Sequence, residues 1–159
     1  MSKRFTETNK WEDKFFRKLS PAAKLLYWYM WDRCDIAGFW EVDLHLASFC
    51  IGVCEAELES AFEELSDKYI VVSSSVWIKT FLKHQRNENL DLNNPAHIGI
   101  LRKIAEHKSF SEKVLNILGK GDLVPLLEDI TCRGYKGATK GLQSAIGKGK
   151  GKGTGKSKG

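Results

Sequence analysis

The sequence predicts a mainly α-helical protein that carries a small β-hairpin. Apolar residues recur with helical spacing through the first two thirds of the chain, and a glycine at residue 52 separates two of these segments. Two short runs of β-branched and aromatic residues flank a serine turn at residues 73–75. The resulting order is helix, helix, strand, helix, turn, helix, hairpin. This order predicts a winged helix-turn-helix domain over residues 5–90, followed by short helices and a disordered tail.

Two helices are predicted before the strand. The first spans residues 11–19, and its apolar positions share one face: Trp11, Phe15, Phe16 and Leu19. Ser20 and Pro21 supply an N-cap and a first helical residue for the second helix, residues 21–33. This helix contains LLYWYMW and is apolar almost all round, so we expect it to be the central helix of the core. A turn over residues 35–38 and a strand over residues 38–42 follow.

The helix-turn-helix pair is predicted at residues 44–50 and 55–66. Asp43 is suited to cap the first helix, and Gly52 suits the turn because glycine tolerates a positive φ. Small or apolar residues occupy the positions where the two helices would touch: Ala47, Ser48, Ile51, Val53, Leu58 and Ala61. The inward face of the second helix would hold Leu58, Ala61, Phe62 and Leu65. Residues 69–72 and 76–78 then form the hairpin.

After the hairpin we predict a short helix at residues 80–87, which closes the first domain. A short helical extension spans residues 91–133, with one helix from the Asn94-Pro95 start to about His107 and weaker helices within residues 111–130. Glycine and lysine dominate from residue 134, which predicts a disordered tail over residues 134–159. The GTGKS at residues 153–157 is not a P-loop, because a P-loop follows a buried strand and begins a helix.

Charge is divided unevenly along the chain. Residues 35–67 hold nine acidic residues and no lysine or arginine, while residues 135–159 hold seven lysines and no acid. Removing those seven lysines from the net charge of +5 leaves −2 for the rest of the chain. The outer face of the second helix of the pair carries Glu55, Glu57, Glu59, Glu63 and Glu64. DNA affinity rests on cations that neutralise phosphate, so this helix is not expected to read bases. Its glutamates Glu55, Glu59 and Glu63 are instead a candidate interface for a protein partner, including another copy of the chain.

Two sets of cations are candidates for contact with a DNA phosphate backbone, double- or single-stranded. In the tail they are Lys136, Lys140, Lys148, Lys150, Lys152, Lys156 and Lys158. In the body they are Lys14, Arg17, Lys18, Lys24, Lys79, Lys83 and Arg86. The alternatives are an ordinary solvated surface for the body set and a solubilising tail without a specific partner.

No catalytic constellation is recognisable, since His45, His84, His97 and His107 are scattered without nucleophile or carboxylate partners at suggestive spacing. We therefore expect no enzyme activity and no cofactor. Cys50 and Cys54 with nearby His45 raise the alternative of zinc, but structural zinc sites usually show two short pairs, so we expect no metal.

The sequence shows no apolar run of about 20 residues and no signal peptide. A cytoplasmic protein without a membrane partner is expected.

Three segments resemble one family. They are WEDKFFRKLSPAAKLLYWYMWDRCDIAGFWEVDLHLASFCIG at residues 11–52, FLKHQ at residues 81–85 and LNNPAH at residues 92–97. Together they are similar to phage replication-initiation proteins of the replisome-organiser, DnaD-like type, over about residues 5–107. The resemblance implies a non-enzymatic protein of the bacterial host cytoplasm that binds origin-region phage DNA. It also implies help in recruiting the replicative helicase or its loader. The alternative is a winged-helix transcription regulator or protein-protein adaptor of phage or prophage origin.

Overall fold

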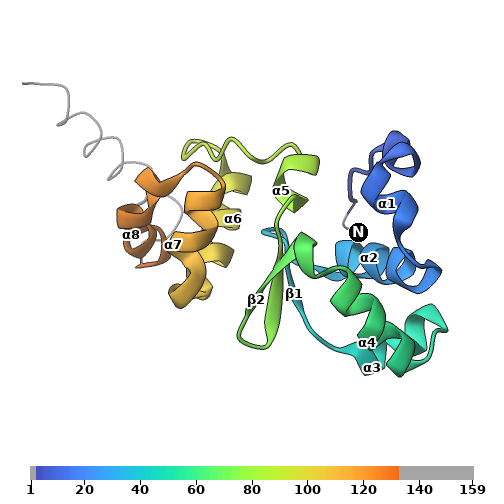
Figure 1. The fold of residues 1–159 in the computed structure, drawn as a ribbon. Helices are drawn as coiled ribbons and strands as arrows, with labels where there is room; N and C mark the ends of the chain where they lie inside the picture. The colour runs from blue at the N-terminus through green and yellow to red at the C-terminus, as the bar shows by residue number, and fades with distance from the viewer. Residues whose placement is uncertain (1–2, 133–159) are drawn as a thin grey trace, which may run out of the picture. The chain divides into compact units, whose positions relative to one another are not determined.

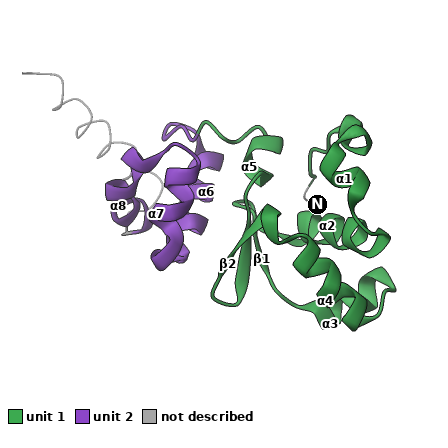
Figure 2. Cartoon of the chain, viewed as in Figure 1, with its two compact units in different colours: residues 1–89 green, residues 90–159 purple. Residues whose placement is uncertain are grey.

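The computed structural model describes residues 3–132, which are mainly helical with one small three-stranded antiparallel sheet. The chain divides into two compact units, residues 1–89 and residues 90–159 (Figure 2). The sequence placed the corresponding boundary between residues 90 and 91. The predicted disordered tail, residues 134–159, lies outside the described residues.

The segment predicted as one helix, residues 11–19, forms two elements instead. A 3-10 helix, η1, spans Thr8–Glu12, and a short α-helix, α1, spans Lys14–Lys18. Asp13 separates them because its backbone is extended and its carboxylate accepts hydrogen bonds from the amides of Phe15 and Phe16. Phe16 and Leu19 are buried as predicted, whereas Trp11 is 59% exposed. The prediction that Trp11 shares this buried face was therefore wrong.

Helix α2 spans Pro21–Arg33, as the Ser20-Pro21 pair predicted. The Ser20 side chain accepts a hydrogen bond from the amide of Ala23, and Pro21 occupies the first turn. The helix is buried along one side, which holds Ala22, Ala23, Leu26, Met30 and Trp31. It is not covered all round, since Leu25 is 48% exposed and Trp28 is half-buried.

The sheet consists of β1 (Phe39–Glu41), β2 (Tyr69–Val72) and β3 (Ser75–Ile78). Strand β3 is central and pairs antiparallel with both neighbours, so the order is β1-β3-β2. Trp77 on β3 is fully buried, and its indole N–H donates to the carbonyl of Ala37 at 2.9 Å. Gly38, just before β1, has φ +91° and a backbone so close to Phe81 that an added Cβ would lie 2.9 Å from the Phe81 Cβ.

Helices α3 (Leu44–Ile51) and α4 (Glu55–Glu64) pack against each other and against α2 (Figure 1). α4 is shorter than the predicted 55–66, because a 3-10 helix, η2 (Ser66–Lys68), begins after Leu65. Helix α5 spans Phe81–His84 rather than residues 80–87. Arg86 adopts a left-handed φ of 59°, which an α-helix cannot continue through.

Unit 2 is helical from its cap onward. Asn94 caps α6 (Pro95–Glu106) by accepting a hydrogen bond from Ala96, and α7 (Lys108–Ile117), η3 (Gly121–Leu126) and α8 (Leu127–Cys132) follow. Its described core includes Ile98, Leu101, Ile104, Val114, Leu115 and Ile130. Within residues 3–132, no helix combines the length and apolar character needed to cross a membrane.

Candidate nucleic-acid interface

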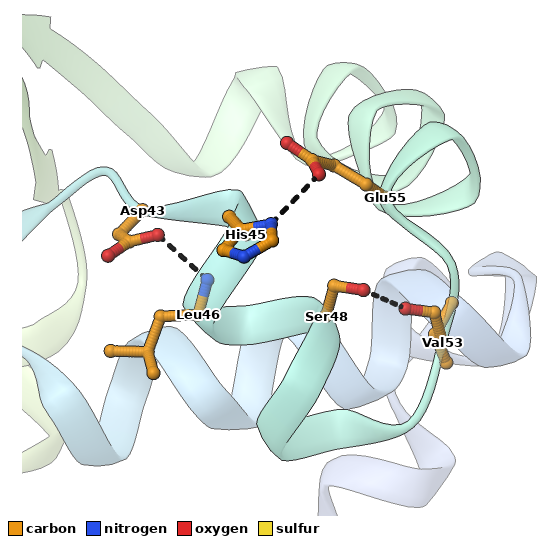
Figure 3. Close-up of polar contacts among 6 residues, drawn as sticks. All are labelled: Asp43, His45, Leu46, Ser48, Val53 and Glu55. Atoms are coloured by element: carbon orange, nitrogen blue, oxygen red, sulfur yellow. Dashed lines mark hydrogen bonds and ion pairs between the residues drawn. The ribbon is translucent and has the colours of Figure 1, made fainter.

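The turn between α3 and α4 is built as the sequence predicted. Asp43 caps α3 through a 2.8 Å hydrogen bond from the amide of Leu46 (Figure 3). Gly52 ends the helix with φ 76°. The Ser48 hydroxyl donates to the carbonyl of Val53 at 2.7 Å, which fastens the turn to the helix before it. The pair is therefore fixed by local chemistry at both ends of α3.

The exposed face of α4 is acidic. Leu58 and Ala61 point into the core, with Leu65 following them, and all five glutamates of the helix are exposed. Two of these carboxylates have partners within the same unit. Glu64 accepts hydrogen bonds from both the amide and the hydroxyl of Ser20, and Glu55 lies 3.4 Å from the His45 ring nitrogen (Figure 3). Glu59 and Glu63 complete the negative surface beside them.

The exposed residues of α3 and of the hairpin tip include apolar and hydroxyl side chains. Phe49 on α3 is 86% exposed and Leu46, one turn earlier, is 40% exposed. The hairpin tip between β2 and β3 consists of Ser73 and Ser74, both exposed. The helix pair and the hairpin tip thus present glutamate, phenylalanine and serine, and neither α3, α4 nor the tip carries a lysine or arginine.

The predicted body cations fall in three places within unit 1. Lys14, Arg17 and Lys18 are exposed on α1, and Lys24 is half-buried on the first turn of α2. The remaining three follow the sheet. The Lys79 ammonium donates to the carbonyl of Asp67 at 3.0 Å, Lys83 is exposed on α5, and the Arg86 guanidinium lies 5.7 Å from the Phe5 ring centroid. The seven tail lysines, Lys136 to Lys158, lie outside the described residues.

Between the N-terminal segment and α2 lies a cleft of about 430 Å³, which we call the aromatic cleft. Aromatic side chains form much of its lining: Phe15, Phe16, Tyr27, Trp28 and Trp31. The polar lining residues come from the N-terminal segment, from η2, and from α5 with the residue before it. They comprise Thr6, Glu7, Asn9, Lys10, Glu12, Asp13, Lys68, Thr80 and His84. Three predicted cations adjoin this lining in sequence: Lys14, Lys79 and Lys83.

Two lysines of the aromatic cleft lie against ring faces. The Lys10 ammonium is 3.5 Å from the Trp28 ring centroid and 6.0 Å from that of Trp11. The Lys68 ammonium is 3.7 Å from the Phe15 centroid. Burial lowers the pKa of Lys10 from its ordinary value, and nearby Asp32 opposes the shift. The aromatic cleft therefore combines cations with aromatic surface.

The carboxylates of the cleft are largely engaged. Glu7 pairs with the His84 ring nitrogen at 2.9 Å. Hydrogen bonds from the amides of Phe16 and Phe15 lower the pKa of Asp13. These contacts use two of the three acidic side chains in the lining, the third being Glu12.

Long-range contacts hold the N-terminal segment in place over α2. The backbone of Phe5 exchanges two hydrogen bonds of 3.0 Å with the side chain of Gln85, which is buried. Arg4 donates to the carbonyl of Cys34 at 2.6 Å and lies over the Phe81 ring. The segment that supplies one side of the cleft is thus anchored by residues 80 positions apart in sequence.

Sequence reasoning missed Lys68 and the cleft itself. Trp11, Phe15 and Phe16 were interpreted as one inward helix face, which concealed that Phe15 and Phe16 border an open space. The available signal was the interleaving of lysines with aromatic residues over residues 10–16.

Other reactive groups offer little chemistry within residues 3–132. Cys50 and Cys54 are exposed free thiols, and burial raises the pKa of the Cys34 thiol to about 12. Among the side chains described, no cluster of three or more His, Cys, Asp or Glu residues is arranged to hold a metal ion.

Comparisons of the chain with protein-family models, with curated proteins and with solved structures gave no match.

Proposed function

We propose that this chain is a non-enzymatic DNA-binding protein of phage replication initiation, which binds origin-region DNA and helps recruit the replicative helicase or its loader. The proposal includes a winged helix-turn-helix for residues 5–90. The single observation that carries it is the combination of the α3–α4 pair, turned at Gly52, with a hairpin whose strands give the order β1-β3-β2. A helix-turn-helix followed by such a hairpin is the arrangement of that fold.

In the proposed mode, DNA is held through phosphate contacts and not by base readout from α4. A helix with five exposed glutamates would meet strong repulsion in a groove lined by phosphates. Cations on α1, beside β3 and on α5, together with the seven tail lysines, supply the attraction. Phosphate contacts position a protein on DNA without carrying sequence information.

A salt titration tests this mode. Full-length protein and a variant with all seven tail lysines changed to glutamine are titrated with origin-region duplex DNA at two salt concentrations. Each lysine that neutralises a phosphate adds about 0.9 to the steepness of the log–log salt dependence on duplex DNA. We expect the variant to bind more weakly and with a shallower slope. An unchanged affinity and slope would remove the tail from the DNA-binding surface.

The second candidate function, a phage or prophage transcription regulator or adaptor, is favoured by the α3–α4 surface. Phe49 and Leu46 expose apolar side chains on α3, and α4, which packs against α3, exposes Glu55, Glu59 and Glu63. Aromatic side chains are enriched in protein interfaces, and the rims of such interfaces are polar. Capture of purified helicase or loader by the wild-type chain, lost with Glu59→Lys and Glu63→Lys, supports the replication role. Promoter repression without such capture supports the second candidate.

A further inference from the structure

The aromatic cleft is not part of the helix pair, and DNA binding through phosphates alone does not require it. We propose that it is a binding site for one nucleotide of single-stranded DNA, whose base stacks on Trp28 and whose phosphates contact Lys10 and Lys68. This inference rests on the proposed DNA-binding function and names the form of DNA that unit 1 takes. Its argument has three steps: size, chemistry and charge.

The size suits part of a nucleotide chain. A volume of about 430 Å³ lies within the range of about 300–1,000 Å³ that is usual for ligand sites. A base inside a duplex is stacked and paired on all sides, so only an unpaired or extruded base can enter a cleft. The site therefore selects single-stranded DNA.

The chemistry of the lining matches a base and its phosphates. Proteins that bind single strands combine aromatic faces, on which any base can stack, with cations that follow the backbone. Trp28 is half-buried, and its ring face is covered by the Lys10 ammonium at 3.5 Å. Because a lysine stem is flexible, this ammonium can leave the ring when a base arrives and then pair with the adjoining phosphate. Lys68 over Phe15 offers the same exchange at a second ring of the lining.

The charges of the lining are mixed, and its positive charges lie on its rings. Lys10 and Lys68 stand over Trp28 and Phe15, while the carboxylates are Glu7, which pairs with His84, Asp13, which caps α1, and Glu12. A ligand whose negative charge adjoins a flat aromatic group therefore meets an ammonium at each of these two rings.

The test compares two labelled oligonucleotides of equal length, oligo(dT) and an abasic strand with the same number of phosphates. Lysines of the tail and body contact both strands alike, so the ratio of their dissociation constants isolates base stacking. We expect full-length wild type to prefer oligo(dT) by roughly 5- to 100-fold, the usual range for stacking on one aromatic side chain. Trp28→Leu should abolish the preference while leaving the abasic affinity unchanged.

Two further variants keep the test decisive if Trp28→Leu does not fold. Lys10→Gln should weaken binding of both strands and reduce the salt slope by about 0.7, the value for one phosphate on a single strand. Lys113→Gln is the matched control, because its ammonium also lies over a ring, that of Phe110 at 5.9 Å, but in unit 2. Lys113→Gln should leave both the preference for oligo(dT) and the salt slope close to those of wild type.

Several outcomes would overturn the inference. Wild type that binds oligo(dT) and the abasic strand equally has no base site, and if it still binds duplex DNA the proposed function stands alone. Wild type that binds no DNA refutes both. A preference for oligo(dT) that survives in folded Trp28→Leu places stacking elsewhere. An arginine- and lysine-rich peptide that binds wild type, loses binding in Trp28→Leu and leaves oligo(dT) unbound would assign the cleft to a protein partner.

Discussion

Two surfaces of unit 1 divide between them the properties that a DNA-binding domain usually combines in one. The α3–α4 pair has a turn at Gly52 and an exposed second helix, yet that helix displays five glutamates. The aromatic cleft lies outside this helix pair, yet it holds lysines against aromatic rings. The difference teaches that the charge and chemistry of a surface, rather than its place in the fold, decide what it can bind.

The largest expected effect is a difference in stability between alanine substitutions at two glycines of unit 1 that have positive φ, Gly38 and Gly52. Gly38→Ala should destabilise the protein by about 2 to 5 kcal/mol, because φ is +91° and the new Cβ would meet Phe81 at 2.9 Å. Gly52→Ala should cost only about 1 to 2 kcal/mol, since φ is +76° but no atom lies within 4 Å of the new Cβ. Urea unfolding of both variants measures the contrast. Equal losses would mean that close packing against α5 does not hold this part of unit 1.

A second pair of changes contrasts the inner and outer sides of the α3–α4 surface. Leu58→Ala should destabilise by about 2 to 5 kcal/mol because the side chain is fully buried. Phe49→Ala should change stability by less than about 0.5 kcal/mol, since the ring is 86% exposed. Thermal unfolding of the two variants gives the comparison. A large loss for Phe49→Ala would show that its ring is part of the folded core and not of an interface.

Reversing the charge of each surface in turn tests which of the two contacts DNA. Lys10→Glu with Lys68→Glu should weaken DNA binding at low salt at least about tenfold, as two phosphate-pairing cations become repulsive. Glu59→Lys with Glu63→Lys should leave the affinity unchanged or raise it. Fluorescence anisotropy with origin-region DNA, after circular dichroism has verified folding, provides the measurement. A large loss of DNA affinity with Glu59→Lys and Glu63→Lys would indicate that α4 itself reads the bases.

The smallest effect concerns the cysteines. Burial raises the pKa of the Cys34 thiol from 9.0 to about 12, whereas Cys50 and Cys54 on the helix pair are exposed. A thiol held neutral by burial binds its proton more tightly when folded, so its contribution to stability is complete below about pH 9. That contribution falls as the pH rises toward 12. In the native protein at pH 8, iodoacetamide should modify Cys50 and Cys54 and spare Cys34, as read by peptide mass spectrometry. Rapid labelling of Cys34 would contradict its burial.

The elements that could be predicted are those whose ends are fixed by neighbouring residues. Ser20 and Pro21 start α2 at the predicted residue, and Asp43 with Gly52 brackets α3. Asp13 escaped prediction because an aspartate within an apolar periodicity can either continue a helix or cap a new one. Here its carboxylate capping Phe15 and Phe16 outweighed the periodicity.

The aromatic cleft could not be predicted for a different reason. The N-terminal segment that forms part of its lining is held by contacts between Phe5 and Gln85, which are separated by 80 residues, and by Arg4 reaching the carbonyl of Cys34. Such pairings leave no periodic trace in the sequence. The glutamates of α4, by contrast, were predicted to be exposed from local spacing alone, and they are.

Photo-crosslinking tests most directly the claim that nucleic acid meets the aromatic cleft and not α4. Full-length protein is irradiated with a single-stranded oligonucleotide that carries 5-iododeoxyuridine, and the crosslinked peptides are identified by mass spectrometry. The expected crosslinks fall on Trp28 and on the cleft residues around it, Phe15 and Tyr27. Crosslinks confined to residues 44–64 of the α3–α4 pair, with Phe49 as the modified ring, would contradict it.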